Sequence, residues 1–312
     1  MKAAAQHPAG GPGREGSGTE PSPDPGAGGP QAACGRLTRW IRYEVARPGR
    51  PSVVQTLRVG ELAHAASMAQ YGRLAVGGAS PRLSGRDGGG RPNRTHEHAH
   101  WLVLDEDGDM RIDHLVLWVP GGLGARETAA CLLIDGLREP SAVVGRDALA
   151  LRLTVTGLDA EAGAPAWLVG PASRWHSRTP FVPPRHTKWV GSGAMRRILE
   201  APEDQLRREI ALRGLPADVV AVAELDPAVM AATRLWRPAP SVRPHERGRL
   251  PSVAIWWDVT FDRPVMGPLV LGHAAHYGMG MFAAAAGVSA QSAHADHLSR
   301  PCAAREPLCS PR

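Results

Sequence analysis

The order of hydrophobic periodicities between residues 37 and 156 is the feature that most constrains the fold. Stretches in which apolar and polar residues alternate are typical of half-buried strands, and apolar residues at a spacing of three or four are typical of helices. The pattern predicts a strand, a helix, two strands joined by a tight turn, a helix and a strand, at residues 37–45, 56–74, 98–104, 112–119, 126–137 and 149–156.

This order is that of a ferredoxin-like unit, whose antiparallel sheet carries both helices on one face and leaves the other face free for a partner. A second, less regular unit follows, with Pro202 in the first turn of its helix and Gly214 just after the end of that helix. Its predicted elements are strands at 175–182, 219–225 and 253–261, a helix at 202–213 and a last strand around the glycines at 272–280. We therefore expect an α+β protein made of tandem ferredoxin-like, RRM-like modules with antiparallel sheets and a C-terminal glycine-rich loop.

The two ends of the chain lack the residues that build a core. Residues 1–36 contain nine Gly and six Pro and no Val, Ile, Leu, Phe, Trp or Tyr, so they cannot bury enough apolar surface to offset their chain entropy. We predict disordered tails at 1–36 and 285–312, with a first module at 37–158 and a second at 172–284. Neither a secretory signal nor an apolar run of roughly 18 residues is recognisable, which predicts a cytoplasmic protein without membrane contact.

Cysteines give no sign of a disulfide framework or of a cysteine zinc site. The four cysteines form no C-x-x-C pair and are far apart or in polar tails; they are Cys34, Cys131, Cys302 and Cys309. We expect reduced thiols and no metal or other cofactor.

Basic charge is concentrated in one part of the chain. Residues 174–249 hold 14 basic and 8 acidic residues, which accounts for the whole net charge of +6. A localised basic stretch suits a polyanion such as nucleic acid. Because 34 of the 36 basic residues are arginine, a coding bias is the alternative explanation.

Three histidines alternate with other residues at the entrance to the predicted hairpin. Strand periodicity would put His96, His98 and His100 on one face. Neutral imidazoles suit either a metal site or general acid/base work near neutral pH. The metallo-hydrolase pattern H-x-H-x-D-H fails here. A metal site, acid/base work or RNA contact, and a structural role all stay open.

The segment that follows, Asp105-Glu106-Asp107-Gly108-Asp109, superficially resembles a calcium-binding loop. Such a loop needs Gly at its sixth position and a bidentate Glu at its twelfth, where this chain has Met110 and Val116. A solvated hairpin turn is the interpretation we favour.

Two further stretches suit contact with RNA. The strip 175–188 combines aromatic and basic residues with a rigid Pro-Pro, so it could stack bases while binding phosphates; an edge strand that leads into a basic loop is the alternative. Glycines at 272–280 could let backbone N–H groups approach phosphate beside two histidines, and a glycine-bent last strand is the alternative. The candidate RNA-binding residues are Arg178, Arg185, His186, Lys188, Gly272, His273, His276, Gly278 and Gly280.

These residues together resemble a known family, the CRISPR-associated RAMP proteins of type I-U (I-G) systems, in which a backbone-type subunit is fused to a guide-RNA-processing endoribonuclease. The matching stretches span about 37–283 and keep their order along the chain. They are Leu83-Ser84-Gly85-Arg86-Asp87, His96–Leu104, Asp105–His114, Leu117–Gly122, Thr179–His186, Glu203–Glu209 and Gly267–Phe282. We expect an N-terminally shortened member of this family.

The resemblance implies metal-independent cleavage of the repeat in precursor guide RNA, by attack of a ribose 2′-hydroxyl on the adjacent phosphate. It also implies that the protein keeps its product and stays with the other subunits of the CRISPR surveillance complex. Our first hypothesis makes His98 the general base and His96 or His100 the acid, with Arg185, His186 and Lys188 binding phosphate.

Two alternatives stay open at this point. The altered glycine loop, which reads Gly272-His273-Ala274-Ala275-His276, and the shortened N-terminus favour a non-catalytic structural subunit that binds guide RNA. The cluster of His96, His98 and His100 leaves room for a metal-dependent hydrolase.

Overall fold

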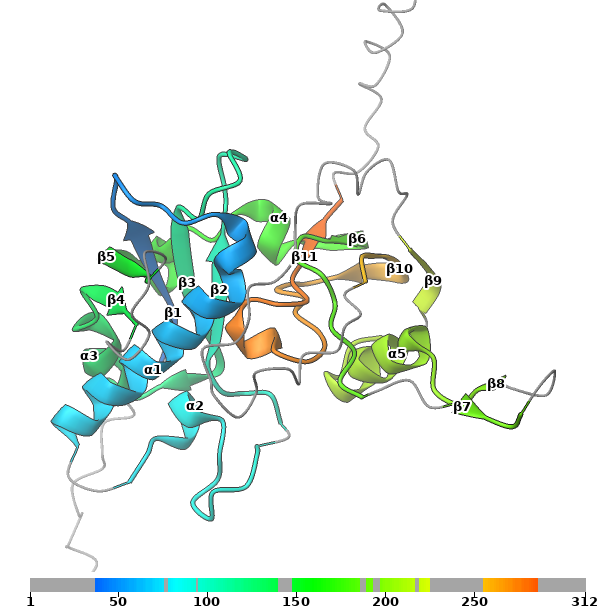
Figure 1. Ribbon diagram of the computed structural model, residues 1–312, viewed down its shortest axis with the longest axis horizontal. Coiled ribbons are helices and arrows are strands. Elements are labelled where there is room, and N and C mark those ends of the chain that lie inside the picture. Colours follow the sequence, from blue (N-terminus) through cyan, green and yellow to red (C-terminus); the bar gives the residue numbers. More distant parts are fainter. Residues whose placement is uncertain are drawn as a thin grey trace, which may run out of the picture. The chain divides into compact units, whose positions relative to one another are not determined.

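The first sheet has the strand order β2-β3-β1-β5-β4, and all its neighbouring pairs run antiparallel. The computed structural model describes residues 37–75, 78–93, 95–139, 148–185, 189–192, 197–216, 219–224 and 255–285. The elements of this sheet and its helices are β1 (Thr38–Val45), α1 (Thr56–Leu74), β2 (His100–Leu104), β3 (His114–Leu123), α3 (Ala125–Leu132), β4 (Gly136–Arg138) and β5 (Ala150–Leu158). Without the short edge strand β4, the four strands β5, β1, β3 and β2 lie side by side in that order (Figure 1). Numbered along the chain, this is the order fourth-first-third-second of a ferredoxin-like unit.

The second sheet repeats this order. Its strands are arranged β11-β6-β10-β9, again antiparallel and again fourth-first-third-second along the chain. Its elements are β6 (Ala172–Ser177), α5 (Pro202–Leu212), β9 (Val219–Glu224), β10 (Trp257–Val265) and β11 (Phe282–Ala284). The predicted fold class, α+β with tandem ferredoxin-like units, is therefore confirmed.

Shorter elements complete the described residues. They are the 3-10 helices η1 (Val53–Gln55), η2 (Asp159–Ala162) and η4 (Ala275–Tyr277), the one-turn helices α2 (Pro81–Ser84) and α4 (Ala166–Val169), and the two-stranded sheet of β7 (Trp189–Val190) and β8 (Arg197–Ile198). Among the described residues, no helix combines the length and apolar character needed to cross a lipid bilayer.

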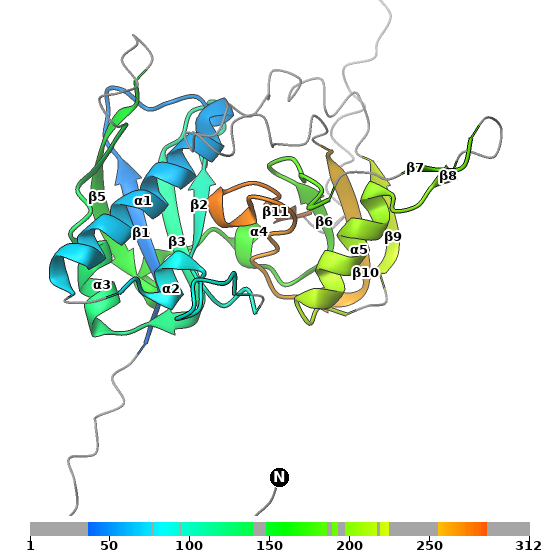
Figure 2. The same cartoon turned by 60° about the horizontal axis from the view of Figure 1, so that its bottom comes forward.

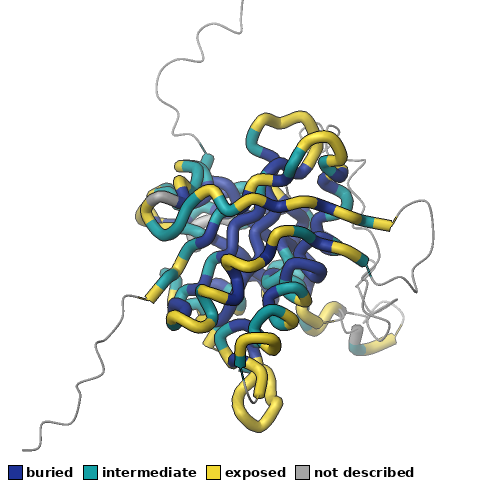
Figure 3. The backbone as a smooth tube through the Cα atoms, turned by 90° about the vertical axis from the view of Figure 1, so that its left-hand side faces the viewer, coloured by how far each residue is buried: buried dark blue, intermediate teal, exposed yellow. Residues whose placement is uncertain are grey.

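The core of the first unit lies between its sheet and helix α1, which crosses one face of the sheet next to α3 (Figure 2). Ile41, Tyr43 and Val45 alternate along β1 and are fully buried with Leu57 and Val59 of α1. Burial of these side chains is the main favourable term in the folding of such a unit. Buried backbone, drawn dark blue, lies in the interior, and the exposed loops are drawn yellow (Figure 3).

The opposite face of the first sheet is covered, which corrects the expectation that it is free for a partner. Leu102, Leu104 and Val116 pack there with Leu168 of α4 and with Met281 beside β11. The second unit thus covers apolar side chains of the first sheet that would otherwise be exposed to water.

Several element boundaries differ from the sequence prediction. Strand β3 continues through Pro120, Gly121 and Gly122, because Gly121 N–H donates to the carbonyl of Glu97 and keeps this end of the strand hydrogen-bonded. Helix α3 ends at Leu132, and the predicted helical residues that follow contain β4 instead. The last strand is β11, after the glycines, so 272–280 forms a loop containing η4.

Some predictions fall outside the described residues. These are the two tails, apart from residue 285, and the candidate RNA-binding residues His186 and Lys188. Cys131 is a buried free thiol, and its burial raises its pKa to about 12. It therefore stays protonated and unreactive.

The buried hydroxyl of Thr179 connects Gly278 of the glycine-rich loop with Met281, which directly follows the loop. It donates to the carbonyl of Gly278 at 2.8 Å and accepts from the N–H of Met281 at 2.9 Å. We expect Thr179→Val to lower the free energy of unfolding by about 3 kcal/mol, because it leaves two buried backbone groups without partners. Urea unfolding measures the free energy of unfolding of this variant. The control is Thr156→Val, at an exposed position of a strand, whose expected effect is near zero. Equal effects of the two variants would contradict the role of Thr179.

Candidate functional site

Four imidazole rings form one cluster, and they come from segments far apart in the sequence. His96, His98 and His100 lie in the segment that leads into β2, and His276 lies in η4 of the glycine-rich loop. The ring centroids of His98 and His276 are 3.9 Å apart, and those of His100 and His276 are 4.1 Å apart. His96 stacks nearly parallel to His276 at 5.8 Å. Residues that the sequence suggested as two separate candidates therefore meet at one place.

The segment before β2 is not a strand, which corrects the alternation argument for these histidines. Strand β2 begins at His100, and His96 has a positive φ of 55°. The segment is held instead by backbone hydrogen bonds. Ala99 N–H donates to the backbone carbonyl of Arg82 at 2.8 Å, and Gly121 N–H donates to the backbone carbonyl of Glu97 at 3.0 Å. It is thus fixed between α2 and β3.

Gly85 makes room for the His98 ring. It ends α2 with a φ of 66°, in the left-handed region that favours glycine. A Cβ atom at this position would lie 2.5 Å from two atoms of the His98 imidazole. Any side chain here would displace His98 from the cluster.

Access to the cluster decreases from His96 to His100. His96 is half-buried, His98 is 8% exposed and His100 is 0% exposed. A substrate group can therefore reach His96 directly and His98 at its edge, whereas His100 is in the position of a supporting residue.

Hydrogen bonding leaves the cluster unusually open to a further partner. Nδ1 of His100 lies 2.8 Å from the carbonyl oxygen of His98; because a carbonyl only accepts, Nδ1 carries the proton, and Nε2 of neutral His100 is bare. That Nε2 and the Nδ1 atoms of His96, His98 and His276 are buried without a hydrogen-bond partner. Four buried nitrogens without partners are costly in a folded protein unless they serve a ligand.

The imidazoles are neutral near pH 7. Burial is the largest cause, followed by the positive charges of neighbouring imidazoles and of Arg213, and together they lower the pKa of His98 to about 4. The same causes lower the pKa values of His100 and His276 well below the usual 6.5. The pKa of His96 is lowered by burial and by Arg213, but Glu209 partly offsets this.

Arg213 and Glu209, from the end of α5, are functional candidates that the sequence reasoning missed. The Arg213 side chain is 10% exposed, and its guanidinium pairs with Glu209 at 3.3 Å. The same carboxylate oxygen of Glu209 accepts the N–H of Gly272 at 3.2 Å, which ties α5 to the glycine-rich loop. The spacing of four residues predicts an ion pair on the helix, but nothing in the sequence brings it to the histidines.

The histidines do not form a metal site in this arrangement. In the part of the chain that the structure describes, the one group of three ligand atoms within 4.8 Å of one another comes from Asp105, Asp107 and Asp109. Three pairs of these histidine rings are stacked, and this works against shared ligation because nitrogen lone pairs lie in the ring plane. The geometry therefore does not support the metal-dependent hydrolase.

The acidic segment is a hairpin turn, as the sequence predicted. Asp105 accepts the N–H groups of Gly108 and Met110 at 2.8 and 3.1 Å, and Asp107 accepts that of Asp109 at 3.2 Å. These carboxylates close the turn between β2 and β3.

The two described arginines of the basic strip are held in different ways. Arg178 donates to the carbonyl of Asp105 at 2.6 Å and lies over the ring of Trp167, so it also connects the two units. The backbone of Arg185 is fixed by the buried amide of Gln205, which accepts from its N–H at 2.9 Å and donates to its carbonyl at 3.1 Å. The Arg185 side chain is 63% exposed and free to meet a ligand, apart from a contact with Glu200 at 3.5 Å.

The loop glycines have packing roles. Gly278 and Gly280 are buried, and Gly272 is half-buried with its N–H bonded to Glu209. Gly278 has a φ of 85°, and a Cβ there would lie 2.9 Å from Thr56 of α1 and 3.1 Å from Val103 of β2. His273 N–H donates to the carbonyl of Val182 at 2.8 Å. The contacts with α1 and β2 explain why glycine occurs at 278.

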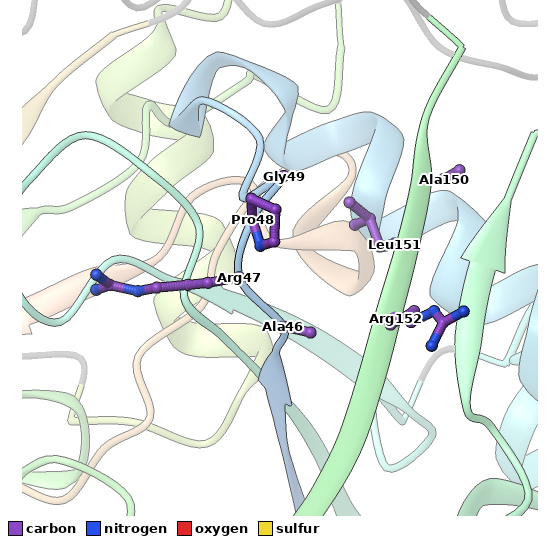
Figure 4. Close-up of a pocket in the computed structure, with 7 residues that line it drawn as sticks. All are labelled: Ala46, Arg47, Pro48, Gly49, Ala150, Leu151 and Arg152. Carbon is purple, nitrogen blue, oxygen red and sulfur yellow. The ribbon is translucent and has the colours of Figure 1, made fainter.

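The cavity in Figure 4, about 350 Å³, is a separate feature. It lies between the residues after β1 and the start of β5. In the strand order β2-β3-β1-β5-β4, strand β3 separates this pair of strands from the far edge strand β2. Arg47 and Arg152 point away from each other there (Figure 4), so they do not converge on one ligand.

Comparisons with known proteins give a likeness of fold. No protein-family model matches the chain, and no curated protein matches it. A solved structure described as "CRISPR associated protein Cas6" is similar at 9% identity and a TM-score of 0.36, over 80% of this chain and 99% of that chain. Another, described as "An RAMP protein binding different RNA substrates", is similar at 12% identity and a TM-score of 0.35, with the same coverage.

We expect Gly278→Ala to lower the free energy of unfolding by about 2 kcal/mol or more, because alanine is strained at positive φ and its Cβ would crowd α1 and β2. The matched control is Gly72→Ala in the exposed part of α1, where nothing lies within 4 Å; it should stabilise by about 0.5–1 kcal/mol. Denaturant unfolding of the two variants checks both signs. Weaker RNA binding with unchanged stability for Gly278→Ala would instead support a direct RNA contact at this position.

Stability should fall as the pH is lowered from about 6.5 towards 4. The unfolded chain binds protons on these imidazoles at higher pH than the folded chain does. Protonation therefore stabilises the unfolded state relative to the folded state in that pH range. For His98 alone, we expect a loss of about 2 kcal/mol between pH 7 and pH 5. Urea unfolding at several pH values measures the slope, and His98→Gln should reduce it. An unchanged slope in that variant would contradict the low pKa of His98.

Proposed function

We propose that the protein is a CRISPR-associated RNA-binding protein that cleaves precursor guide RNA without a metal ion, using the histidine cluster. The observation that carries the proposal is the meeting of His96, His98 and His100 with His276, with buried nitrogens that have no partner. Neutral imidazoles next to a buried arginine suit an acid/base reaction at a phosphate.

The reaction is a transesterification within the RNA. A base removes the proton of a ribose 2′-hydroxyl, the 2′-oxygen attacks the adjacent phosphorus, and the bond from phosphorus to the 5′-oxygen breaks. An acid donates a proton to the leaving 5′-oxygen. The products are a 2′,3′-cyclic phosphate and a 5′-hydroxyl, so atoms and charges balance without a water molecule.

Roles within the cluster follow from burial and charge. His98, whose pKa of about 4 keeps it neutral, is our candidate for the base. His96 is the most accessible ring, and Glu209 partly offsets the lowering of its pKa by burial and by Arg213, so it is our candidate for the acid. His100 is a positioning residue, since it is fully buried, stacks with His98 and contacts His276 with its ring tilted by 45°.

The resemblance to type I-U RAMP proteins supports CRISPR repeat RNA as the substrate and the other surveillance-complex subunits as partners. Arg185, with its fixed backbone and exposed guanidinium, is our candidate for binding the RNA backbone outside the cluster. His186, Lys188 and Arg178 extend the same strip.

A non-catalytic RNA-binding subunit is the second candidate. The observation that favours it is the low exposure of the base candidate, since His98 is only 8% exposed and covered on one side by Gly85. Such a subunit would bind repeat RNA tightly and give no product.

Cleavage of end-labelled repeat RNA in excess chelator tests the proposal. We expect cleavage by the wild-type protein, and none when the RNA carries a 2′-deoxy nucleotide at the cleavage position. His96→Gln and His98→Gln should each slow cleavage about 100-fold or more, since a general acid or base contributes about that much. His114→Gln, on β3 and bonded to Asp113, is the matched control and should cleave at the wild-type rate.

Three results would separate the candidates. Tight binding without product would replace the endoribonuclease by the structural subunit. Cleavage abolished by the chelator would contradict the metal-independent reaction. Cleavage at the wild-type rate in both His96→Gln and His98→Gln would remove the cluster from the chemistry.

A further inference from the structure

Arg213 is a buried cation whose hydrogen bonding is incomplete. Its side chain is 10% exposed, and one terminal nitrogen donates to Glu209 at 3.3 Å. Its Nε is buried and has no partner. A buried guanidinium that leaves a donor unpaired is destabilising unless another acceptor completes it.

Glu209, the partner of Arg213, is also shared. Its Oε2 accepts from Arg213 and from the N–H of Gly272, so a single carboxylate oxygen serves a cation and a backbone group. This arrangement fixes the guanidinium next to the loop that carries His276 while leaving part of its fork unused.

The surroundings of Arg213 offer nitrogen atoms and little negative charge. The charged groups that act on the four imidazoles are the imidazoles themselves, Arg213 and Glu209. Arg213 Nε and four imidazole nitrogens are buried without a partner, and Glu209 joins Arg213 to Gly272 of the loop that carries His276. An oxyanion such as a phosphate, with several acceptor oxygens and a negative charge, is the ligand chemistry that complements this set.

We propose that Arg213 is a further functional residue of the site, which binds a phosphate group of the RNA together with the histidine cluster. This inference rests on the proposed function and deepens it, because the phosphate is the one next to the attacked bond. Glu209 is then a positioning residue, which holds Arg213 and the Gly272 end of the loop in place.

Binding of a phosphate at this place should take up protons. The free imidazoles are neutral near pH 7, and a negative phosphate favours their charged form. Affinity therefore decreases as the pH rises. Between pH 6 and pH 8 we expect a loss of about fourfold for each imidazole whose pKa the phosphate returns to its ordinary 6.5.

Two double variants test the role of Arg213 at constant net charge. Glu209→Gln with Arg213→Gln removes the buried pair and leaves no unpaired buried charge. Glu203→Gln with Arg207→Gln removes a more exposed pair of the same spacing on the same helix. Each protein is titrated in chelator with 2′-deoxy-substituted repeat RNA, which cannot be cleaved, at pH 6, 7 and 8. Unfolding midpoints confirm that the variants fold, and Arg213→Lys replaces the first double variant if that variant does not fold.

We expect the buried double variant to bind RNA about tenfold or more weakly and with a smaller pH dependence, since charge-assisted hydrogen bonds are lost. The exposed pair should change affinity less than about twofold. Arg213→Lys keeps the charge without the fork, so its loss should be intermediate. Wild-type affinity and pH dependence in the buried double variant, or in Arg213→Lys if that variant stands in, would overturn the inference.

Inorganic phosphate separates this inference from the proposed function. In NMR spectra of the full chain, phosphate should shift the histidine resonances of the cluster more than chloride does at equal ionic strength, and the buried double variant should lose this response. That result with no RNA cleavage by the wild type would support phosphate binding and reject the endoribonuclease. Cleavage at the wild-type rate by the buried double variant would support the endoribonuclease and reject the role of Arg213.

Discussion

The packing of the glycine-rich loop against α1 and β2 is the contact on which the rest of the site depends. Met279 lies in the core of the first unit, and Gly278 lies so close to α1 and β2 that a Cβ atom would crowd both. Backbone at such close range tolerates few conformations, because the interior is as densely packed as an organic crystal. This contact joins the two ferredoxin-like units and also brings the His276 ring onto that of His98. The histidine cluster and the association of the two units therefore have the same cause.

Burial decides the electrostatics of the cluster. Imidazoles stacked in the interior lose the hydration that favours their charged form, and each proton that binds one ring opposes a proton on the next. Arg213 adds a positive charge of its own, with Glu209 as its carboxylate partner. The cluster is thus neutral near pH 7. An exposed trio of histidines would titrate near 6.5 in the absence of a ligand.

Sequence patterns predicted the helices and strands better than the contacts between distant elements. The bounds of α1 and the order of strands follow from local periodicity and from end signals such as Pro202 and Gly214, because these depend on neighbours in the chain. Alternation grouped His96 with His98 and His100, although only His100 lies in β2, and hydrogen bonds to α2 and β3 hold the other two. The approach of His276 and of Arg213 could not be predicted, because it depends on how the second unit packs. The packing of Gly278 could not be predicted for the same reason, since its neighbours are about 175 to 220 residues away along the chain.

The connection between β10 and β11 shows why the site lies where it does. In a regular ferredoxin-like unit a helix makes this crossover, but here residues 266–281, all of them described, contain only the three-residue helix η4. A full helix would cover its own sheet and satisfy its backbone internally. A glycine-rich loop instead hydrogen-bonds outward, to Glu209, Val182 and Thr179. It can therefore carry a histidine away from its own sheet and into contact with the neighbouring one. The loop has less regular structure than a helix would have. In return, it places the His276 ring of the second unit against the His96 and His98 rings of the first.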